Sequence, residues 1–346
     1  MQYSNELTTT WQTPSNIAIV KYWGKREVQE PVNPSISFSL SAARTTTKIT
    51  ISPREEGGFL FLLDGKETTG FDTKIKKFLE LVQGRLPIIK NHFLKIESSN
   101  TFPHSTGIAS SASSMSALAF CLADLQQQTN RKHPLNISEV SSLARLGSGS
   151  AARSVFGGWN LWGRLSEIPE SSDHYAIPAP VSVAPVFQTF HDDILIVNST
   201  TKPVSSSAGH ALMNNHPFRD GRINQAHTNA LNLLKHLETG NLDAFIELAE
   251  SEALSLHALM MSSSPSYTLL QPNSLILIEK IREFRKTNDI PVCFTMDAGP
   301  NIHLLYPHEF SEKVKEWQER QLKPLCEEGR IIRDFVGKGP QKIINS

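Results

Sequence analysis

Residues 102–122 read FPHSTGIASSASSMSALAFCL, and this stretch decides how the rest of the chain is interpreted. It follows a strand-like run at 93–96 and starts with a loop of small residues. Apolar residues at helical spacing come next: Met115, Leu118, Ala119 and Leu122. A strand, a small-residue loop and a helix N-terminus can bind an anion, because free N–H groups and the helix dipole favour negative charge. The simpler interpretation is a helix preceded by an ordinary loop. Neither GxxxxGK[ST] nor GxGxxG is present, so the stretch indicates phosphate without saying which phosphate compound.

The composition is that of an ordinary globular protein without excess charge. The 346 residues are 39% hydrophobic and 20% charged, and Lys+Arg and Asp+Glu both total 34. This length favours about two domains. Balanced charge gives no general attraction to nucleic acid or to a membrane surface, so any anion must be bound by a local patch.

Cysteine usage and hydropathy predict where the protein works. Cys121, Cys293 and Cys326 lie far apart and form no CxxC pair, which is typical of reduced thiols in a cytosolic protein. The polar start, MQYSNELTTTWQ, lacks the apolar segment of a signal peptide. No apolar run approaches the ~18 residues that a membrane span needs. We therefore expect a soluble, cytoplasmic protein.

Residues 14–25, PSNIAIVKYWGK, combine a short apolar run with two lysines. The run at 17–20 predicts a strand that delivers Lys21 and Lys25 into a loop. The alternative is a strand end with solvated lysines. Further strands are predicted at 35–40, 48–52 and 59–63, the last before an Asp64-Gly65 hairpin turn, and a helix at 72–82.

Residues 147–163, GSGSAARSVFGGWNLWG, form a second small-residue segment, this time around an arginine. Arg153 in a serine-lined, backbone-permissive turn can bind a carboxylate or a phosphate through its planar fork. The alternative is an ordinary surface arginine. A polar linker at 126–136 and a short helix, capped near Ser138-Glu139 and ending near Leu146, are predicted before it.

The second half is predicted to be rich in helices. A Pro/Ser/Ala-rich stretch at 169–185 marks a change of composition, and a strand at 190–198 and a hydroxyl-rich loop at 202–209 follow it. Helices are predicted at about 224–237, 242–261, 274–286 and 311–326, and strands at 292–296, 302–306 and 331–336.

Familiar metal and hydrolase motifs are missing from the sequence. There is no HExxH and no GxSxG, and the histidines, including His210, are interpreted as structural. Serines cluster at 105–116, 148–154 and 205–207, where they can donate hydrogen bonds to phosphate or hold Mg²⁺. Asp297, in the tight turn DAGPN, is either a turn former or, if buried near a cation, a base.

Several stretches resemble the GHMP kinase superfamily and, within it, the diphosphomevalonate decarboxylase family. They are NIAIVKYWGKR (16–26), FPHSTGIASSAS (102–113), ARLGSGSAARSVFGG (144–158), VSSSAG (204–209) and FTMDAGPN (294–301). They occur in the family's order over most of the chain. KYWGK, the GSGSA segment with its arginine, and DAGPN are specific to the family, whereas the small-residue loop is typical of the whole superfamily.

The resemblance implies an α+β fold of two lobes with the active site between them. The N-terminal lobe, residues 1–188, would resemble ribosomal protein S5 domain 2 and bind ATP. The C-terminal lobe, residues 189–346, would be ferredoxin-like. Many relatives are homodimers, so a homodimer is expected, with a small-molecule substrate and neither nucleic acid nor membrane as partner.

The resemblance also implies an ATP-dependent reaction. Mevalonate 5-diphosphate is phosphorylated on its 3-hydroxyl, and loss of that phosphate and of CO₂ yields isopentenyl diphosphate. The family's catalytic aspartate falls on Asp297, which would take the hydroxyl proton. Its arginine falls on Arg153, which would hold the substrate carboxylate, and its lysine falls on Lys21, near the reacting oxygen. Phosphoryl transfer needs such positioned charges and little covalent chemistry, and a nearby Lys21 would keep Asp297 ionised.

Binding residues are carried over in the same way. The substrate would contact Tyr22, Trp23, Gly24, Lys25, Lys74, Ser148, Gly149, Ser150, Ala151, Ala152 and Ser207. The cofactors would be ATP and Mg²⁺. ATP phosphates would be wrapped by Ser105, Thr106, Gly107, Ala109, Ser110, Ser111 and Ala112, with Ser110 or Ser111 near Mg²⁺.

Two departures from the family pattern keep alternatives open. His104-Ser105-Thr106 stands where many members have Thr-Ala-Ala, so His104 either contacts a phosphate or packs. Ser207 is neutral where some bacterial relatives use arginine toward the diphosphate, so one alternative is a decarboxylase of mevalonate 5-monophosphate. The others are a GHMP kinase that stops after phosphorylation and a catalytically silent, nucleotide-binding homologue. The presence of Asp297, Lys21 and Arg153 argues against the silent homologue.

Overall fold

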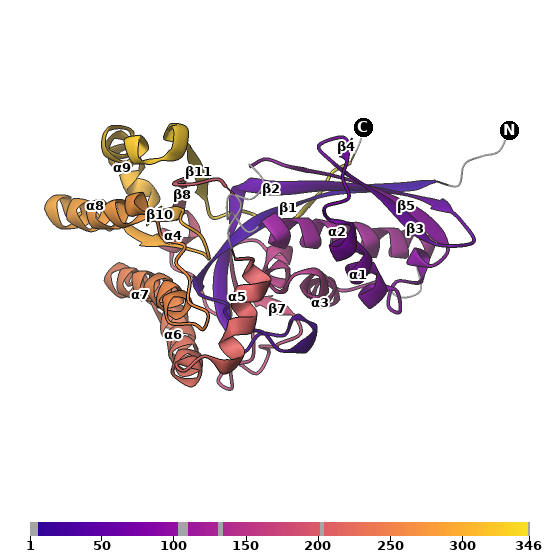
Figure 1. Cartoon of the computed structure of the whole chain (residues 1–346), viewed down its shortest axis with the longest axis horizontal. Helices are drawn as coiled ribbons and strands as arrows, with labels where there is room; N and C mark the ends of the chain where they lie inside the picture. The colour runs from indigo at the N-terminus through magenta and orange to yellow at the C-terminus, as the bar shows by residue number, and fades with distance from the viewer. Residues whose placement is uncertain (1–5, 103–109, 131–133, 201–203, 345–346) are drawn as a thin grey trace.

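Two lobes of mixed helix and sheet lie end to end (Figure 1). The computed structural model describes residues 6–102, 110–130, 134–200 and 204–344. One sheet runs through the lobe that carries the N-terminus, and a smaller, separate sheet lies in the other. The expected α+β architecture of two lobes is confirmed.

The larger sheet has the strand order β12-β1-β2-β5-β3-β4. In addition, β6 pairs with the start of β2, and β7 pairs with β6. Its strands are β1 (Leu7–Val20), β2 (Ser35–Pro53), β3 (Gly58–Leu63), β4 (Lys66–Glu67), β5 (His92–Asn100), β6 (Trp159–Trp162), β7 (Ala176–Pro178) and β12 (Gln341–Lys342). All neighbours are antiparallel except β3 and β5, which are parallel. Because β12 pairs with β1, the end of the chain returns to the N-terminal lobe, which a simple division at 188/189 does not describe.

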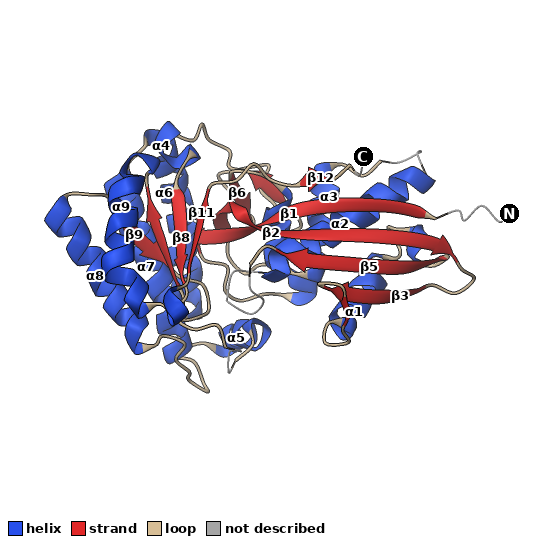
Figure 2. Cartoon of the chain, turned by 90° about the horizontal axis from the view of Figure 1, so that it is seen from above, coloured by secondary structure: helices blue, strands red, loops and turns tan. Residues whose placement is uncertain are grey.

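Three helices cover one face of this sheet (Figures 1 and 2). They are α1 (Asp72–Val82), α2 (Ser110–Thr129) and α3 (Ile137–Gly147). Helix α1 buries Ile75, Phe78, Leu79 and Val82, the apolar stripe that predicted it. Their core with the sheet also contains Ile49, Leu94, Ile96, Leu118 and Leu122. This packing fixes the direction of α2, whose first turn faces the cavity described below.

Strand β2 is a single strand where two were predicted, at 35–40 and 48–52. The joining residues are held by one buried carboxylate from the other lobe. Asp334 accepts the backbone N–H groups of Ser41 and Ala43, both at 2.7 Å, and that of Ala42 at 2.8 Å. The sequence of 41–47 alone does not reveal this distant partner. Through these hydrogen bonds the long strand is connected to the other lobe.

The smaller sheet has the order β11-β8-β10-β9 and is antiparallel throughout. Its strands are β8 (His191–Leu195), β9 (Cys293–Thr295), β10 (Ile302–Tyr306) and β11 (Ile331–Phe335). The helices of this lobe are α4 (Pro185–Gln188), α5 (Ser206–Leu212), α6 (Arg219–Thr239), α7 (Leu242–Met261), α8 (Pro272–Asn288) and α9 (Ser311–Trp317). Helices α6 to α9 gather around this sheet at the end of the molecule away from the N-terminus (Figure 1).

One hydrophobic core joins the two lobes. Ile17 and Phe38 of the larger sheet pack in the same cluster as Leu233 of α6 and Phe245 of α7. Burying such side chains removes several hundred Å² of apolar surface from water, at about 25 cal/mol per Å². The end of β1 is therefore placed against α6 and α7, which is where the site begins.

Several predicted elements are confirmed and others are corrected. The bounds of α1, α7 and β10 agree with the prediction, and the Asp64-Gly65 hairpin turn is present. Helix α2 continues to Thr129, into the predicted linker, and α3 is capped by Asn136 rather than Ser138. Asn136 accepts the N–H of Glu139, whose carboxylate bonds back to the N–H of Asn136.

Two further corrections concern the second half. Part of the predicted 202–209 loop is the helix α5, because Ser205 caps it by accepting the N–H of Ala208. The predicted helix at 311–326 stays α-helical only to Trp317 and continues as a π turn and 3-10 turns. Of the helices in the described ranges, none has the length and apolarity to span a membrane.

Candidate active site

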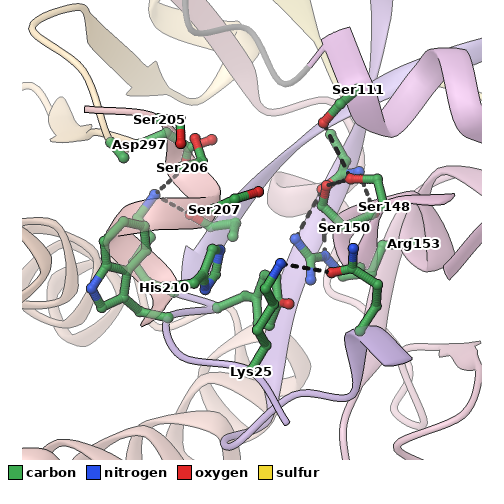
Figure 3. A pocket seen from close by; sticks show the side chains of 18 of the residues that line it. Lys25, Ser111, Ser148, Ser150, Arg153, Ser205, Ser206, Ser207, His210 and Asp297 are labelled. Atoms are coloured by element: carbon green, nitrogen blue, oxygen red, sulfur yellow. Dashed lines mark hydrogen bonds and ion pairs between the residues drawn. The ribbon is translucent and has the colours of Figure 1, made fainter. Parts of the chain in front are cut away.

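A cavity of about 470 Å³ opens where the two lobes meet (Figure 3). Its walls come from the end of β1, the start of α2, the 3-10 helix η3 (Gly149–Val155), α5 and the turn after β9. Most of the predicted site residues line it: Lys21, Tyr22, Trp23, Lys25, Lys74, Ser110, Ser111, Ser148, Gly149, Ser150, Arg153, Ser207 and Asp297. The fold thus brings together segments that lie far apart in the sequence.

Lys21 is buried at the end of β1, with 1% of the residue exposed. Its ammonium donates to the carbonyl of Ala18 and, at 3.1 Å, to Oδ1 of Asp297. Burial lowers the pKa of Lys21, and the Asp297 carboxylate opposes this shift by favouring the charged form. The cavity therefore contains a buried cation beside a carboxylate.

The backbone of Lys21 is held by a buried ion pair from the C-terminal lobe. Glu252 of α7 accepts the N–H of Lys21 at 2.8 Å, and Arg222 of α6 donates to its carbonyl at 3.1 Å. Arg222 and Glu252 form a bidentate ion pair with N–O distances of 2.7 and 2.6 Å. The side-chain amide of Asn229 also donates to Glu252, at 2.7 Å. Both charges are almost fully buried, so each one depends on the other. This clamp positions Lys21 from across the lobe boundary.

Asp297 lies in the tight turn that follows β9. The N–H of Gly299 bonds the Asp297 carbonyl at 2.7 Å, and His257 of α7 contacts the same carbonyl at 3.1 Å. The side chain is 30% exposed, toward the cavity that Lys21 also faces. The turn keeps the carboxylate accessible to a ligand while the pair with Lys21 is maintained.

Arg153 projects from η3 with its guanidinium buried. Nε donates to Ser37 at 3.0 Å, and Nη2 donates to Asn16 at 3.3 Å. Nη1 is buried too, and no residue in the described ranges accepts from it. Burial lowers the pKa of Arg153 to about 10, opposed by Asp297 and Tyr22, so the group stays charged at neutral pH. A buried guanidinium with a spare donor suits a carboxylate ligand.

A row of hydroxyls leads from η3 to the start of α2 (Figure 3). Ser111 contacts Ser148 at 3.2 Å, and Ser148 contacts Ser150 at 3.3 Å. Tyr22 lies over Gly149, where a Cβ would come within 2.7 Å of its Oη. The Tyr22 hydroxyl is buried with no partner in the described part of the chain, and burial raises its pKa. These neutral donors can bind ligand oxygens.

Two lysines supply positive charge to the same cavity. Lys25 donates to Gln29 at 3.3 Å, and Lys74 extends from α1. The pKa of Lys25 is lowered, by loss of hydration first and by Lys77 second. The pKa of Lys74 is lowered by loss of hydration and then by Lys25. Neighbouring cations that repel one another favour a ligand with more than one negative charge.

Other predicted residues lie behind the cavity wall or outside the description. Ala112, Ala151 and Ala152 are fully buried, and Gly24 turns the chain with φ at +92°. None of these four contributes to the cavity surface in the described structure. His104, Ser105, Thr106, Gly107 and Ala109 lie outside the described residues.

Sequence reasoning missed several residues that contribute to the site. Asn16 and His210 line the cavity, and Arg222 and Glu252 hold Lys21. Asn16 is a polar residue in a buried strand, which is a usable signal. His210 follows VSSSAG directly, but nothing in its spacing distinguishes it from a structural histidine.

Few of the described side chains could bind a metal ion through oxygen. Nowhere in the described ranges do three His, Cys, Asp or Glu side chains gather around one point. The hydroxyls of Ser110 and Ser111 face the cavity at the start of α2. Mg²⁺ is usually bound by one or two protein oxygens together with phosphate oxygens and water, so this sparse set is compatible with it.

Comparisons with known proteins agree over both lobes. Residues 13–176 match the family model described as Diphosphomevalonate decarboxylase-like N-terminal domain. Residues 193–341 match that described as Mevalonate 5-diphosphate decarboxylase C-terminal domain. Residues 177–192 lie between the two matches, and the expected lobe division at 188/189 stays a prediction.

Curated relatives carry the same description. The chain is 32% identical to the diphosphomevalonate decarboxylase of Ganoderma lucidum over 89% of this chain and 80% of the relative. It is 31% identical to that of Saccharomyces cerevisiae over 89% and 80%.

Solved structures give the same result. A structure described as MDDEF in complex with MVAPP, AMPPCP and magnesium superposes with a TM-score of 0.84 at 29% identity, covering 98% of this chain and 100% of that one. Mevalonate diphosphate decarboxylase from Staphylococcus aureus gives 0.86 at 28% identity, covering 98% of each chain.

Proposed function

The chain belongs to the diphosphomevalonate decarboxylase family, and we infer that it catalyses the ATP-dependent decarboxylation of (R)-mevalonate 5-diphosphate. The products are isopentenyl diphosphate, ADP, phosphate and CO₂, and the reaction belongs to the mevalonate pathway of isoprenoid biosynthesis. One observation carries this function. The Lys21–Asp297 pair lines a single cavity between the lobes together with Arg153, whose Nη1 has no acceptor among the described residues.

The first step is phosphoryl transfer to the 3-hydroxyl. Asp297 accepts the hydroxyl proton while the oxygen attacks the γ-phosphorus of ATP and ADP leaves. Lys21, 3.1 Å from the carboxylate, attracts the charged form of Asp297 and stabilises the negative charge that develops on the oxygen. Because the backbone of Lys21 is clamped at both its N–H and its carbonyl, this charge is in place before the substrate arrives.

The second step removes phosphate and CO₂. The C3–O bond breaks with its electron pair leaving on phosphate, and C3 becomes electron-poor. The C1–C2 bond then breaks, its electrons form the C2–C3 double bond, and the carboxylate departs as CO₂. Arg153 holds that carboxylate in line through its buried fork, and the hydroxyls of Ser148, Ser150 and Tyr22 orient the rest of the substrate.

ATP phosphates and Mg²⁺ would be held by Ser110 and Ser111 at the start of α2. Ser110 and Ser111 face the cavity there, and a helix N-terminus attracts phosphate. When bound, Mg²⁺ neutralises phosphate charge for the transfer. Lys25 and Lys74 hold the 5-diphosphate, because two neighbouring cations match its two phosphates. The cytoplasmic location and the homodimer stay predictions.

The experiment that tests this function is ATP-dependent release of CO₂ from the purified protein. Mevalonate 5-diphosphate and 5-monophosphate are supplied side by side, and ADP is measured in the same reactions. We expect CO₂ with the diphosphate alone. Release with the monophosphate alone would assign the sister activity and direct attention to the neutral Ser207. ADP without CO₂ would indicate a kinase, and no product with either substrate would indicate a silent homologue.

A further inference from the structure

His210 lies where two of the segments that resemble the family, residues 16–26 and 204–209, pack against each other. It lies on α5, is 8% exposed, and forms part of the cavity wall. Its ring packs against Tyr22 at 4.4 Å and Trp23 at 4.6 Å between centroids. Figure 3 shows it on the same side of the cavity as Ser207 and Lys25. The residue is therefore held firmly in the wall of the cavity.

The hydrogen bond to Gly24 determines which ring nitrogen carries the proton. The backbone N–H of Gly24 donates to Nδ1 of His210 at 2.9 Å, so Nδ1 must present a lone pair. In a neutral imidazole the proton then resides on Nε2. In the described part of the chain, nothing accepts a hydrogen bond from Nε2.

Two glycines make this arrangement possible. Gly24 has φ at +92°, and a Cβ there would come within 2.6 Å of Val32. A Cβ on Gly209 would come within 2.7 Å of the Trp23 ring. Gly209 thus lets α5 approach the Trp23 ring, and Gly24 lets the loop turn beside Val32. Gly24 also supplies the N–H group that bonds His210, and Gly209 is its neighbour in the chain.

The ring is neutral at pH 7. Burial lowers the pKa of His210 to about 3, and the nearby charge of Lys25 acts in the same direction. A neutral ring offers one donor and no charge. It therefore adds a directional hydrogen bond next to Lys25 without increasing the repulsion among the cations of the cavity.

We propose that His210 is a substrate-binding residue whose Nε2–H donates a hydrogen bond to an oxygen of the substrate phosphate held by Lys25. The proposal rests on the proposed function, since that phosphate is part of mevalonate 5-diphosphate. The competing interpretation is that His210 only holds the Gly24 turn through Nδ1. Both interpretations agree with the burial, and they differ in which nitrogen matters for binding.

Matched substitutions separate the two nitrogens. In His210→Asn the amide oxygen can replace Nδ1 as the acceptor for Gly24, but nothing reaches the Nε2 position. In His210→Gln the amide nitrogen reaches the Nε2 position and the acceptor for Gly24 is lost. His210→Met removes both. Dissociation constants for mevalonate 5-diphosphate are measured by calorimetry without ATP, and thermal unfolding shows whether each variant is folded.

We expect His210→Asn to raise the Kd about tenfold, since a hydrogen bond to a charged group typically contributes that much. His210→Gln should stay within about threefold of the wild type, and His210→Met should match His210→Asn. The reverse order, with Asn like the wild type and Gln impaired, would overturn the proposal in favour of the Gly24 turn.

Nitrogen-15 NMR of the wild type gives a test that needs no variant. The ring should show the Nε2–H tautomer, and its Nε2 resonance should shift when mevalonate 5-diphosphate is added. An Nδ1–H tautomer, or an unchanged Nε2 resonance at saturating substrate, would overturn the proposal. Failure of the proposed function would look different: the wild type would bind the diphosphate with the expected dependence on His210 but release no CO₂.

Discussion

The Lys21 side of the cavity and its Lys25 side are constructed in opposite ways. Around Lys21, the ammonium, the backbone N–H and the carbonyl are all hydrogen-bonded within the protein, partly by the buried pair Arg222–Glu252. Around Lys25, the ammonium has one amide partner at 3.3 Å, and its neighbour Lys74 adds a second positive charge. The polar groups on the Lys21 side thus have partners within the protein, whereas on the Lys25 side we expect the substrate to supply them.

This difference separates two contributions to activity. Groups fixed in advance lower the barrier of the chemical step, because nothing has to reorganise when charge develops. Cations that repel one another in the free protein gain most when an anion binds, so they contribute to affinity. Changes on the Lys21 side should therefore reduce kcat, whereas changes on the Lys25 side should raise KM. The following substitutions test that separation, from the largest expected effect to the smallest.

Asp297→Asn should have the largest effect. The amide keeps the shape of the side chain but cannot take the hydroxyl proton, and general-base catalysis typically contributes 10²- to 10⁴-fold. We expect kcat to fall about a thousandfold while the Kd values for ATP and mevalonate 5-diphosphate change little. Asp220→Asn, at a side chain that is 90% exposed, is the matched control. A variant with near-normal turnover would remove Asp297 from the role of base.

Glu252→Gln should reduce both kcat and stability. It leaves the buried Arg222 without its carboxylate, which typically costs about 3 kcal/mol, and weakens the support of the Lys21 backbone. We expect kcat to fall about ten- to hundredfold, because small displacements of a catalytic group are costly. KM should change little, and steady-state kinetics with chemical unfolding measures both effects.

Two controls separate positioning from stability. Glu250→Gln, on the same helix, removes the partner of Arg282 and Arg285 without touching Lys21, so it should reduce stability but not kcat. The double substitution Arg222→Met with Glu252→Leu should recover stability, since apolar replacement of a buried pair is often neutral. It should not recover kcat. Recovery of kcat in the double variant would mean that the clamp only stabilises the fold.

Lys25→Gln and Lys74→Gln should act on binding alone. Each removes one charge near the expected diphosphate, so we expect KM for mevalonate 5-diphosphate to rise about tenfold with kcat nearly unchanged. The preference for the diphosphate over the monophosphate should fall, and KM should become less sensitive to salt. Lys76→Gln, on the same helix as Lys74 but away from this cavity, is the control. A fall in kcat without a rise in KM would contradict the assignment of these lysines to binding.

Sequence reasoning reached further on the fold where the pattern was local. The apolar spacing of α1 and α7 is contained within each helix, so their bounds could be predicted. The continuity of β2 could not, because it depends on Asp334, a residue nearly 300 positions away. The cap of α3 was missed by two residues, since both Asn136 and Ser138 have side chains that can cap a helix.

The site shows the same division. Lys21, Arg153 and Asp297 stand in motifs short enough to recognise, and the structure brings all three to one cavity. Arg222 and Glu252 lie in helix interiors 30 positions apart, where charged residues usually indicate a solvated face. Only the packing of α6 and α7 against β1 shows that they are buried and paired. Residues that position a proposed catalytic group are thus harder to predict than the group itself.

The smallest expected effect concerns His210, a neutral residue beside the cations of the Lys25 side, and it appears as acid sensitivity of folding. Its pKa is lowered to about 3 in the folded protein, against about 6.5 in an unfolded chain. Below pH 6.5 the unfolded state binds a proton that the folded state does not, so stability falls as pH falls from 6.5 toward 3. The loss is about 1.4 kcal/mol per pH unit, or about 2 kcal/mol at pH 5.

His210→Asn cannot titrate, so between pH 7 and pH 5 its unfolding free energy should fall by about 2 kcal/mol less than that of the wild type. Denaturant unfolding at both values measures this difference, in which all other titrating groups cancel. An equal loss in both proteins would mean that His210 takes up its proton in the folded state. His210 could then not be the neutral hydrogen-bond donor that we propose beside Lys25.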